Sequence, residues 1–415
     1  MNRSGDDGPY DVAVIGAGAA GLMAAIHAAE RGKRVLLLEK NRKPGVKILM
    51  SGGTRCNITH DCDNRGIVEA FGPNGKFLHS ALATLTVQQT IAFFEELGVA
   101  TKAEDTGKIF PVSNRALDVL NALLTRLRRS GATLSLEEPV GDLRRSAACD
   151  FEITTALRQL TVPKIILTTG GLSYPGCGTR GDGYAFVQRM GHSLVATRPA
   201  LVPITVQADW IAELRGVTLA DVNLTVMENS KRLLARRGGF LFAHFGLTGP
   251  APLDVSKAIT RHPKPASLEL EIDFLPAMEE SAYDDFLRTA SLEAGKKQLG
   301  GVMAELLPRR LCDSLLTLTE QLTDRKATSL SKTDRTRLVA ATKRLRIPIR
   351  GTLGFEKAEV TTGGVSLAEV DSSTMESKLV PGLFLAGEIL DLDGPIGGYN
   401  FQAAWSTGWL AGAKV

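Results

Sequence analysis

The start of the chain alternates between apolar runs and a helical pattern. Val12–Ile15 is a short uninterrupted apolar run, typical of a strand that is buried on both faces. Leu22–Glu30 is rich in alanine and is followed by Gly32, which favours a helix that ends at a glycine. Val35–Leu38 is a second apolar run, and it leads into Glu39. This order predicts a strand, a helix and a second strand of a parallel α/β sheet.

A different pattern occupies the middle of the chain. Leu268–Phe274 alternates apolar and acidic residues with a period of two, which predicts a strand with one buried face. Residues 201–275 contain four strand-like runs: LVPITV, VNLTVM, GFLFAHF and LELEIDF. Residues 282–344 have helical patterns instead, for example GGVMAELLPRRLCDSLLTL. We therefore expect a small β-barrel followed by a helical element.

Length and composition limit the class of protein. The 415 residues suggest two or three domains, and 44% hydrophobic with 23% charged residues is ordinary for a globular protein. A net charge of +4 is too small to indicate a nucleic-acid or membrane partner by itself. The five cysteines do not resemble a disulfide framework, and no Cys/His set has metal-ligand spacing. We therefore expect a cytoplasmic protein without a metal site.

The longest uncharged run, Val12–Ala29, raises the question of a signal peptide or a membrane span. The preceding segment, MNRSGDDGPYD, contains three aspartates and one arginine, which is the wrong sign for a signal peptide. The run also contains regularly spaced glycines. We therefore expect neither export nor a membrane partner.

The residues between the first predicted strand and helix, Gly16-Ala17-Gly18-Ala19-Ala20-Gly21, satisfy the pattern G-x-G-x-x-G. The first glycine permits a tight turn, the second lets a pyrophosphate approach the backbone, and the third lets helix and strand pack closely. The following helix offers unpaired N–H groups to the phosphates. Glu39 is placed to accept hydrogen bonds from a ribose diol and disfavours a 2′-phosphate. The unit predicts a Rossmann-type site for adenosine diphosphate, which FAD and NAD both contain.

A second match to this pattern, Gly176–Gly181, is not interpreted as another Rossmann site. The strand-like run Lys164–Thr168 ends well before it, and no acidic residue follows at the next strand end. We expect this segment to form a loop beside the first nucleotide. The strand leads into Thr169-Gly170-Gly171, and glycine-rich ends of parallel strands line the ligand crevice of open α/β sheets.

Further stretches carry a resemblance to a known family. They are GVKILMSGGTRCNIT (45–59), GKIFPVSNRALDV (107–119), GGLSYPGCGTRGDGY (170–184), LFAHFGLTGPAPL (241–253) and residues 361–408. Together they resemble the bacterial flavoproteins labelled NAD(P)/FAD-dependent oxidoreductases of the aminoacetone-oxidase-like, or HI-type conserved flavoprotein, family. The resemblance extends over nearly the whole chain and implies FAD more firmly than it implies a substrate.

The resemblance implies a glutathione-reductase-like α/β fold, in which a two-part Rossmann-like FAD-binding domain is interrupted by an inserted β-barrel plus helical domain. We expect the FAD-binding domain at 1–195 and 350–415, and an inserted substrate or lid domain at 196–349. Within the insert, the barrel is expected over about 200–275 and the helices over about 280–345.

The resemblance also gives a role to the glycine- and acid-rich segment LFLAGEILDLDGPIGGYNFQAAWSTG near the end of the chain. Gly387-Glu388 matches the second FAD fingerprint of such folds, in which an acid accepts from the ribityl chain. Gly397–Asn400 opens the final helix, whose N–H groups would face the pyrimidine edge of the flavin. The implied cofactor-binding residues are Gly16, Gly18, Ala19, Ala20, Gly21, Glu39, Lys40, Lys47, Ser51, Gly52, Gly53, Arg55, Cys56, Asn57, Val140, Thr169, Gly170, Gly171, Gly387, Glu388, Asp393, Gly397, Gly398, Tyr399 and Asn400.

Few side chains qualify as catalytic groups. His244, in a loop of the insert that could cover the flavin ring, and Tyr399 are candidate proton donors, with a loop histidine and a packing tyrosine as the alternatives. Tyr174 is a weaker candidate of the same kind. Cys56 and Cys62 are further apart than the cysteines of disulfide reductases of this fold class. We therefore expect no redox-active disulfide, with Cys56 packed beside the flavin.

The leading functional prediction is an FAD-dependent oxidoreductase that transfers a hydride between flavin N5 and a small organic substrate. Amine or amino-acid oxidation and enone reduction both remain open, with NAD(P)H as a candidate electron donor. The alternative is an RNA-associated flavoprotein that uses residues 309–350, which contain 11 Lys/Arg and four Asp/Glu but no aromatic residue. An NAD-only dehydrogenase is a third reading, but it leaves the C-terminal glycine-acid cluster unexplained.

Overall fold

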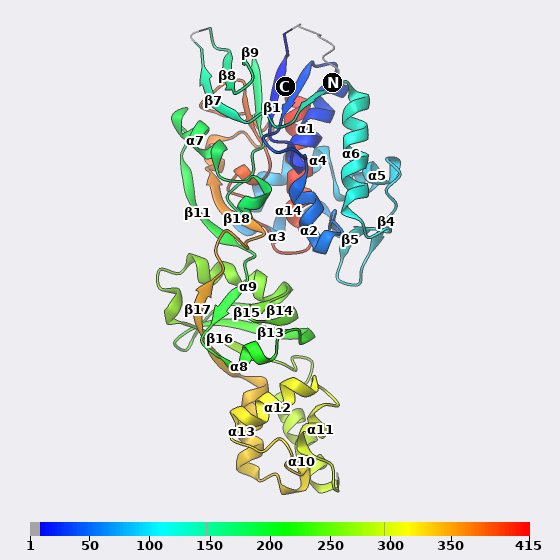
Figure 1. Ribbon diagram of the computed structural model, residues 1–415, viewed down its shortest axis with the longest axis vertical. Helices are drawn as coiled ribbons and strands as arrows, with labels where there is room; N and C mark the ends of the chain where they lie inside the picture. Colours follow the sequence, from blue (N-terminus) through cyan, green and yellow to red (C-terminus); the bar gives the residue numbers. More distant parts are fainter. Residues whose placement is uncertain (1–8, 147, 294) are drawn as a thin grey trace. The chain divides into compact units, whose positions relative to one another are not determined.

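The computed structural model describes residues 9–415 apart from 147 and 294, and the chain forms two compact units (Figure 1). Unit 1 contains the residues up to Arg198 together with Val360–Val415, and unit 2 contains Pro199–Glu359. Residues 350–359, which the sequence prediction assigned to the FAD-binding domain, belong to unit 2. The predicted α/β class with a Rossmann-type parallel sheet is confirmed.

Unit 1 is built on a parallel sheet whose strand order in the described chain is β19-β10-β1-β2-β6. The central strand β1 pairs in parallel register with β10 on one side and with β2 on the other. Its residues are fully or almost fully buried, as expected for a strand covered on both faces. The strands are β1 (Val12–Ile15), β2 (Val35–Leu38), β6 (Thr133–Ser135), β10 (Lys164–Leu167) and β19 (Leu383–Leu385).

Two helices from opposite ends of the chain lie against each other in unit 1. α1 (Ala19–Glu30) and the C-terminal helix α14 (Tyr399–Lys414) run side by side in Figure 1. Gly408 and Gly412 make this approach close, because a Cβ at either position would lie 2.3 Å and 2.5 Å from the carbonyl oxygens of Ala20 and Ala24. The packing brings the last segment of the chain to the glycine-rich loop at its beginning.

Smaller sheets and helices complete unit 1. The antiparallel sheets have the orders β3-β5-β4 and β7-β8-β9, and β11 pairs with β18. The strands are β3 (Thr59–His60), β4 (Thr101–Ala103), β5 (Lys108–Pro111), β7 (Val140–Arg145), β8 (Phe151–Thr155), β9 (Gln159–Val162), β11 (Leu194–Ala200) and β18 (Val360–Val365). The helices are α2 (Val46–Thr54), α3 (Asn64–Ala70), α4 (His79–Thr84), α5 (Val87–Glu96), α6 (Ala116–Ser130) and α7 (Asp182–Arg189).

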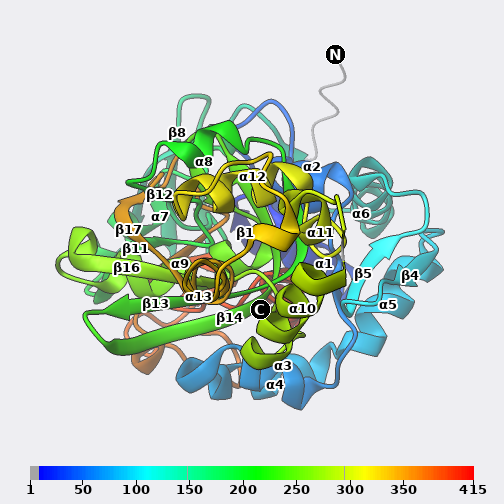
Figure 2. The same cartoon turned by 90° about the horizontal axis from the view of Figure 1, so that it is seen from below.

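Unit 2 combines a closed barrel with a group of helices. The barrel order is β12-β15-β14-β13-β16-β17, and the long β13–β14 hairpin is visible in Figure 2. Phe240, Phe242 and Phe274 pack in its interior. The strands are β12 (Ile204–Val206), β13 (Thr218–Glu228), β14 (Lys231–Ala243), β15 (Gly246–Thr248), β16 (Leu268–Asp273) and β17 (Leu345–Thr352). The helices are α8 (Trp210–Glu213), α9 (Pro250–Arg261), α10 (Glu280–Glu293), α11 (Leu299–Met303), α12 (Arg309–Leu318) and α13 (Lys332–Lys343).

The closing strand of the barrel is the main difference from the sequence prediction. β17 follows the helices in the chain, yet it pairs with both β12 and β16. The prediction placed the barrel entirely before the helices because it relied on local pattern, and Leu345–Thr352 contains a proline and two arginines that obscure its period of two. Only the long-range pairing identifies it as a barrel strand.

Candidate cofactor site and active site

The glycine-rich loop after β1 has the geometry of a phosphate-binding turn. Gly16 adopts φ 104°, and a Cβ there would lie 2.7 Å from the carbonyl oxygen of Thr168. A Cβ on Gly21 would lie 1.8 Å from the carbonyl oxygen of Gly16, so this position tolerates no side chain. A Cβ on Gly18 would meet no atom within 4 Å. The two outer glycines are therefore required by the fold itself, whereas Gly18 borders open space beside the N-terminus of α1.

Glu39 lies at the end of β2, next to this loop. One of its carboxylate oxygens accepts from the backbone N–H of Ala17 and the other from that of Asn41, both at 2.8 Å. These bonds hold the side chain in place although the residue is buried. A carboxylate has about four acceptor sites, so capacity remains for a ribose diol.

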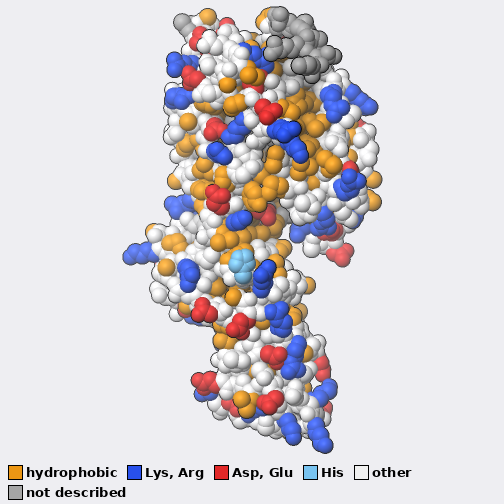
Figure 3. Space-filling view, viewed as in Figure 1, with side chains coloured by type: hydrophobic (Ala, Val, Ile, Leu, Met, Phe, Trp, Pro, Cys, Tyr) orange, Lys and Arg blue, Asp and Glu red, His pale blue; other side chains and the backbone are white. Residues whose placement is uncertain are grey.

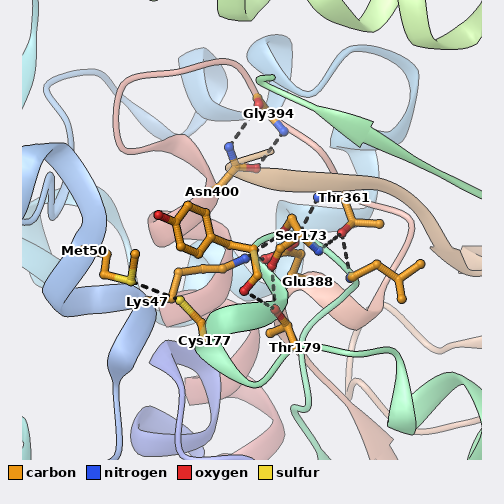
Figure 4. Close-up of polar contacts among 11 residues, drawn as sticks. Lys47, Met50, Ser173, Cys177, Thr179, Thr361, Glu388, Gly394 and Asn400 are labelled. Atoms are coloured by element: carbon orange, nitrogen blue, oxygen red, sulfur yellow. Dashed lines mark hydrogen bonds and ion pairs between the residues drawn. The ribbon is translucent and has the colours of Figure 1, made fainter. Parts of the chain in front are cut away.

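A charged and hydroxyl network joins distant parts of unit 1 (Figure 4). Lys47 Nζ lies 2.7 Å from a carboxylate oxygen of Glu388 and donates to Ser173 Oγ at 2.9 Å. Ser173 Oγ donates to the other Glu388 oxygen at 2.6 Å, and the backbone N–H of Thr361 donates to that same oxygen at 2.9 Å. One cation and two hydrogen-bond donors thereby fix the position of the Glu388 side chain.

Thr361 supports this network from β18. Its Oγ1 accepts from the backbone N–H groups of Leu172 and Ser173, at 2.8 Å and 3.0 Å. A Cβ on Gly171 would lie 2.5 Å from the same oxygen, so the loop after β10 fits against β18 only with glycine at this position. Ser173 and Thr361 were missed as site residues, although both lie within the quoted family-like stretches. The sequence did contain a signal for these two residues, because each hydroxyl lies close to a pair of adjacent glycines.

The segment Ser51–Asn57 forms a second turn with unusual backbone conformation. Ser51, Gly52 and Gly53 leave the helical region inside α2, and Thr54 and Cys56 have positive φ of 70° and 62°. Left-handed backbone at residues other than glycine costs energy and is concentrated at functional sites. A run of this kind also directs successive N–H groups outward, as in the concave turns that bind anions.

The C-terminal loop meets the first half of the chain at several points. A Cβ on Gly387 would lie 2.8 Å from the Cβ of Ala20 in α1, and the Gly387 N–H donates to Thr407 Oγ1 at 3.0 Å. The side chain of Asn400 closes the loop by accepting from the N–H of Gly394 and donating to its carbonyl, at 2.8 Å and 2.9 Å. Figure 4 shows this pair beside the Lys47–Glu388 network.

His60 lies against this loop and was not predicted. Its Nδ1 is 3.0 Å from the carbonyl oxygen of Gly397, so that nitrogen carries the proton. The imidazole stacks on the ring of Tyr399, with centroids 4.4 Å apart and planes inclined by 22°. Tyr399, a predicted proton donor, therefore has a titratable ring as its neighbour.

Other predicted residues lie at the margins of this site or away from it. Lys40 pairs with Asp182, and Arg55 pairs with Glu104 at 2.6 Å while stacking on Phe110. Asp393 accepts from Thr362 at 2.5 Å, and Val140 begins β7 two residues after Glu138, whose N–H donates to the Glu39 carbonyl. His244 is an exposed residue of unit 2, between β14 and β15. Its predicted role over the flavin stays a prediction.

The segment Gly176–Gly181 forms a loop beside Lys40 and Asn41. Asn41 Nδ2 donates to the carbonyl of Cys177 at 2.9 Å, and Asp182, which follows the loop, pairs with Lys40. Cys177 Sγ also lies 3.3 Å from Met50 Sδ (Figure 4). The second G-x-G-x-x-G match thus neighbours the residues that follow Glu39.

The site has features that fit FAD. Among the described residues of unit 1, three buried side-chain polar atoms have no hydrogen-bond partner: Asn57 Oδ1, Thr169 Oγ1 and Tyr184 Oη. Burial, with the nearby carboxylates of Glu388 and Asp391, raises the pKa of Tyr184, so its hydroxyl stays protonated as a donor. Buried groups without partners are rare in folded proteins, and a polar ligand would satisfy them.

Gly18 and Gly53 add backbone that borders open space. Glu39 would hold the adenosine ribose, the Gly16–Gly21 loop the pyrophosphate, and Glu388 the ribityl chain.

Cys56 is buried and Cys62 is partly buried. Cys56 and Cys62 are both free thiols. Burial raises the pKa of Cys56 to about 12 and that of Cys62 to about 11, so neither is a thiolate at neutral pH. Within the residues that the structure describes, no group of three or more His, Cys, Asp or Glu could hold a metal ion.

The basic stretch 309–350 is largely paired with acids. Arg309 pairs with Asp313, Arg325 with Asp334 and Arg335 with Asp284, at 2.8 to 2.9 Å. Lys343, Arg344 and Arg346 also contact carboxylates. Figure 3 shows acidic and basic side chains interspersed over the lower part of the molecule, where these helices lie. The charge count of this stretch therefore overstates its attraction for RNA.

Among the described helices, none is both long and apolar enough to cross a membrane.

Comparison with known proteins places this chain among whole-length relatives. Residues 10–414 match the family model described as the HI0933-like protein Rossmann domain. A ribosomal RNA dihydrouridine synthase of Escherichia coli is 34% identical over 402 residues, which cover 96% of each chain. A 3-dehydro-bile acid delta(4,6)-reductase of Clostridium scindens is 32% identical, covering 99% of this chain and 98% of the other. A ribosomal RNA dihydrouridine synthase of Haemophilus influenzae is also 32% identical, covering 97% of each.

Solved structures with the same fold are more distant in sequence. The 3-ketosteroid delta1-dehydrogenase of Sterolibacterium denitrificans has a TM-score of 0.52 at 14% identity, covering 98% of this chain and 99% of the other. The Mycobacterium smegmatis Sdh1 complex has a TM-score of 0.51 at 18% identity, covering 98% of this chain and 68% of that one. At these identities the similarity concerns the fold alone.

Proposed function

Because the chain belongs to the HI0933-like family of Rossmann-domain proteins, we propose that it is an FAD-dependent reductase of a carbon–carbon double bond conjugated to a carbonyl group. The predicted fold and the assignment to FAD-dependent oxidoreductases are confirmed at the level of the family. The aminoacetone-oxidase part of the predicted label is not supported, since none of the relatives described above is named as an amine oxidase.

The observation that carries the proposal is the meeting of two distant segments at one end of the parallel sheet. The Gly16–Gly21 loop and Glu39 would hold one end of a dinucleotide, and the loop Gly387–Asn400 adjoins them through Ala20 and Lys47. Such an arrangement suits a single extended cofactor that carries both a pyrophosphate and a redox-active ring.

The reaction class follows from chemistry that the relatives' names share. Dihydrouridine differs from uridine by two hydrogens on the double bond next to a ring carbonyl. A delta-4 double bond of a 3-oxo steroid is likewise conjugated to a carbonyl. In both cases a hydride adds to the carbon distant from the carbonyl and a proton adds to the carbon beside it. One site can serve either substrate if its cavity admits the ring.

Uridine in ribosomal RNA is the first substrate to test, since the relatives from both E. coli and H. influenzae are named for it. A 3-oxo bile acid or related enone is the second candidate, supported by 32% identity to the C. scindens protein over 99% of this chain. Amine and amino-acid substrates have no comparable support.

The residues of the site have separate tasks in this proposal. When bound, FAD would supply the hydride, after receiving it from NAD(P)H. Lys47 and Ser173 hold the Glu388 side chain in place, where it would accept a hydrogen bond from the ribityl chain. Tyr399 Oη delivers the proton to the carbon beside the carbonyl, and the His60 ring stacked on it positions the phenol.

The test uses purified holoenzyme under anaerobic conditions. Bleaching of the flavin by NADPH or NADH would identify the electron donor. The reduced enzyme is then mixed with rRNA from cells that lack it, and dihydrouridine is measured by nucleoside mass spectrometry. A parallel reaction with a 3-oxo-delta-4 steroid is followed through loss of enone absorbance. We expect dihydrouridine to form, and absence of both products would overturn the proposed reaction class.

A matched variant tests the proton donor. Tyr399→Phe keeps the stacking surface and removes only the hydroxyl. We expect flavin bleaching by NAD(P)H to be unchanged and product formation to fall by about 100-fold, the usual contribution of a positioned general acid. Unchanged product formation would assign the proton to another group.

A further inference from the structure

A cleft on the surface of unit 1 lies outside the cofactor site. It encloses about 300 Å³ and is lined by Leu143, Arg144, Arg145, Arg189, Met190 and Val380. These residues come from β7, from the end of α7 and from the loop before β19. None of them belongs to the dinucleotide loops or to the Lys47–Glu388 network.

The arginines of the cleft are oriented by their neighbours. Arg144 and Arg189 contact opposite oxygens of Asp142, at 2.5 Å and 3.0 Å. Arg189 lies over the ring of Phe186 and Arg145 over the ring of Phe151, and Arg145 also donates to the carbonyl of Pro381. Such contacts fix planar guanidinium groups while leaving further N–H donors.

The charge of the cleft is not balanced. Its lining contains three arginines and no acid, and the adjacent Asp142 and Glu152, which lies opposite Arg144 on β8, leave a net charge of one positive unit. The side chains of Arg144 and Arg189 are 75% and 53% exposed, and the floor is apolar, formed by the buried Leu143 and Val380 with Met190 beside them. Guanidinium groups beside an apolar surface suit a phosphate ester that is attached to a sugar or a base.

We propose that this cleft binds the phosphodiester backbone of the RNA substrate. The inference rests on the proposed reduction of uridine in RNA and adds to it a contact outside the reacting site. The cleft lies beside Val380 and Pro381, which precede β19, so it is at the amino end of the parallel sheet, whereas the dinucleotide loops follow the carboxyl ends of the strands. An RNA that presents its target base to the cofactor site would therefore extend along unit 1 for several nucleotides to place a phosphate in the cleft.

An RNA backbone suits the cleft better than a small nucleotide does. Small-ligand sites bury most of their ligand, whereas Arg144 and Arg189 lie at the open surface. Phosphate contacts with a polymer are made at such surfaces and position it without reading its sequence. Arg309, Arg325 and Arg335 of unit 2 lack this net charge, because an acid neutralises each of them.

The experiment measures binding by the full-length holoenzyme. Fluorescein-labelled poly(U) is titrated by fluorescence anisotropy over a series of salt concentrations. The double variant Arg144→Ala/Arg189→Ala removes two charges from the cleft. The control Arg65→Ala/Arg129→Ala removes two charges from exposed helix positions elsewhere in unit 1. Arg144→Glu, at the most exposed position of the cleft, provides a variant with little structural risk.

We expect the cleft double variant to bind poly(U) at least about tenfold more weakly, and its plot of log K against log salt to lose a slope of about 1.4, or 0.7 for each phosphate contact. Arg144→Glu should weaken binding in the same direction. The control should keep the wild-type slope, and all variants should retain flavin and its bleaching by NAD(P)H.

Three results would overturn the inference. Equal losses in both double variants would indicate general charge, and an unchanged slope in the cleft variant would exclude phosphate contacts there. A raised KM for NADPH without a loss of poly(U) binding would assign the cleft to the dinucleotide. The proposed function fails separately, through absence of dihydrouridine and of steroid reduction by the wild-type enzyme.

Discussion

The cofactor end of unit 1 and the helices of unit 2 use charged residues in opposite ways. In unit 1, Lys47 meets Glu388 across 341 positions of the chain, in a place where both side chains are partly buried. In unit 2, Arg309 meets Asp313 one helical turn away, and the pair is exposed. The first contact exists only because the sheet and α14 bring the ends of the chain together. The second forms on a single helix.

The difference shows that charge density in a sequence does not locate function. Residues 309–350 attracted attention because they are rich in Lys and Arg, yet the structure pairs many of them with acids on their own surface. Lys47 and Glu388 meet from opposite ends of the chain, and the hydroxyl of Tyr184, near Glu388, is a buried polar atom without a partner. Convergence of distant polar groups is the more informative observation.

The largest effect is expected from replacing a glycine at the cofactor end of unit 1, with a glycine of unit 2 as the control. Gly18→Val places a branched side chain where the pyrophosphate must approach, so FAD affinity should fall by at least about 100-fold, or about 2.7 kcal/mol. The variant should be purified colourless but folded, since a Cβ there meets no atom within 4 Å. Gly301→Val in α11 of unit 2 is the control and should keep the flavin. Flavin content by absorbance and unfolding by circular dichroism measure both, and a yellow Gly18→Val protein would contradict the placement.

A smaller effect is expected from breaking one ion pair in each region. Lys47→Met leaves Glu388 partly buried without its cation, and we expect roughly tenfold weaker FAD binding, about 1.4 kcal/mol, measured by fluorescence titration. Adding Glu388→Gln should recover part of the loss. Arg309→Met should change the free energy of unfolding by about 0.5 kcal/mol or less, because its pair with Asp313 is exposed. If Lys47→Met and Arg309→Met gave losses of equal free energy, the two regions would not differ in how strongly they depend on their ion pairs.

The smallest effects concern acid stability. Burial alone would raise the pKa of Glu138, but hydrogen bonds from Arg158, Ser135 and Thr155 more than offset it and lower the pKa. A carboxylate with a depressed pKa stabilises the fold above its unfolded-state value, 4.5, and loses that contribution as the pH falls through the folded-state pKa. Glu138→Gln should therefore lower the free energy of unfolding by roughly 1 kcal/mol at neutral pH. The expected loss is no larger because Arg158 is partly exposed, so solvent weakens its interaction with Glu138.

The pH series provides the check on Glu138. The difference in Tm between wild type and Glu138→Gln should narrow as the pH is lowered below about 4.5. Asp334→Asn in unit 2 is the comparison, since a hydrogen bond from Ser331 and the nearby Arg325 also lower the pKa of Asp334, at an exposed position. Its effect should have the same sign and be smaller. A difference for Glu138→Gln that grows on acidification would contradict the assigned cause.

Much of unit 1 was predictable because its signals are local. The apolar runs 12–15 and 35–38 are the strands β1 and β2, and the glycine pattern lies where the turn requires it. The predicted helix at Leu22 begins earlier, at Ala19, because Gly18 already has extended backbone and serves as the N-cap. Ser173, Thr361 and His60 were not predicted, since a hydroxyl or an imidazole acquires a role only through neighbours that lie far away in the chain.

The sequence by itself determined the parallel α/β unit, the phosphate loop and the acid at Glu39, because turns, helix starts and strand periods depend on residues close together in the chain. The tertiary structure decided that β17 closes the barrel and that Lys47, Ser173, Thr361 and Glu388 form one network. It also decided that Arg335 is neutralised by Asp284 and that other arginines surround an open cleft. These outcomes depend on strand pairing and packing between segments that are distant in the chain, which local pattern does not determine.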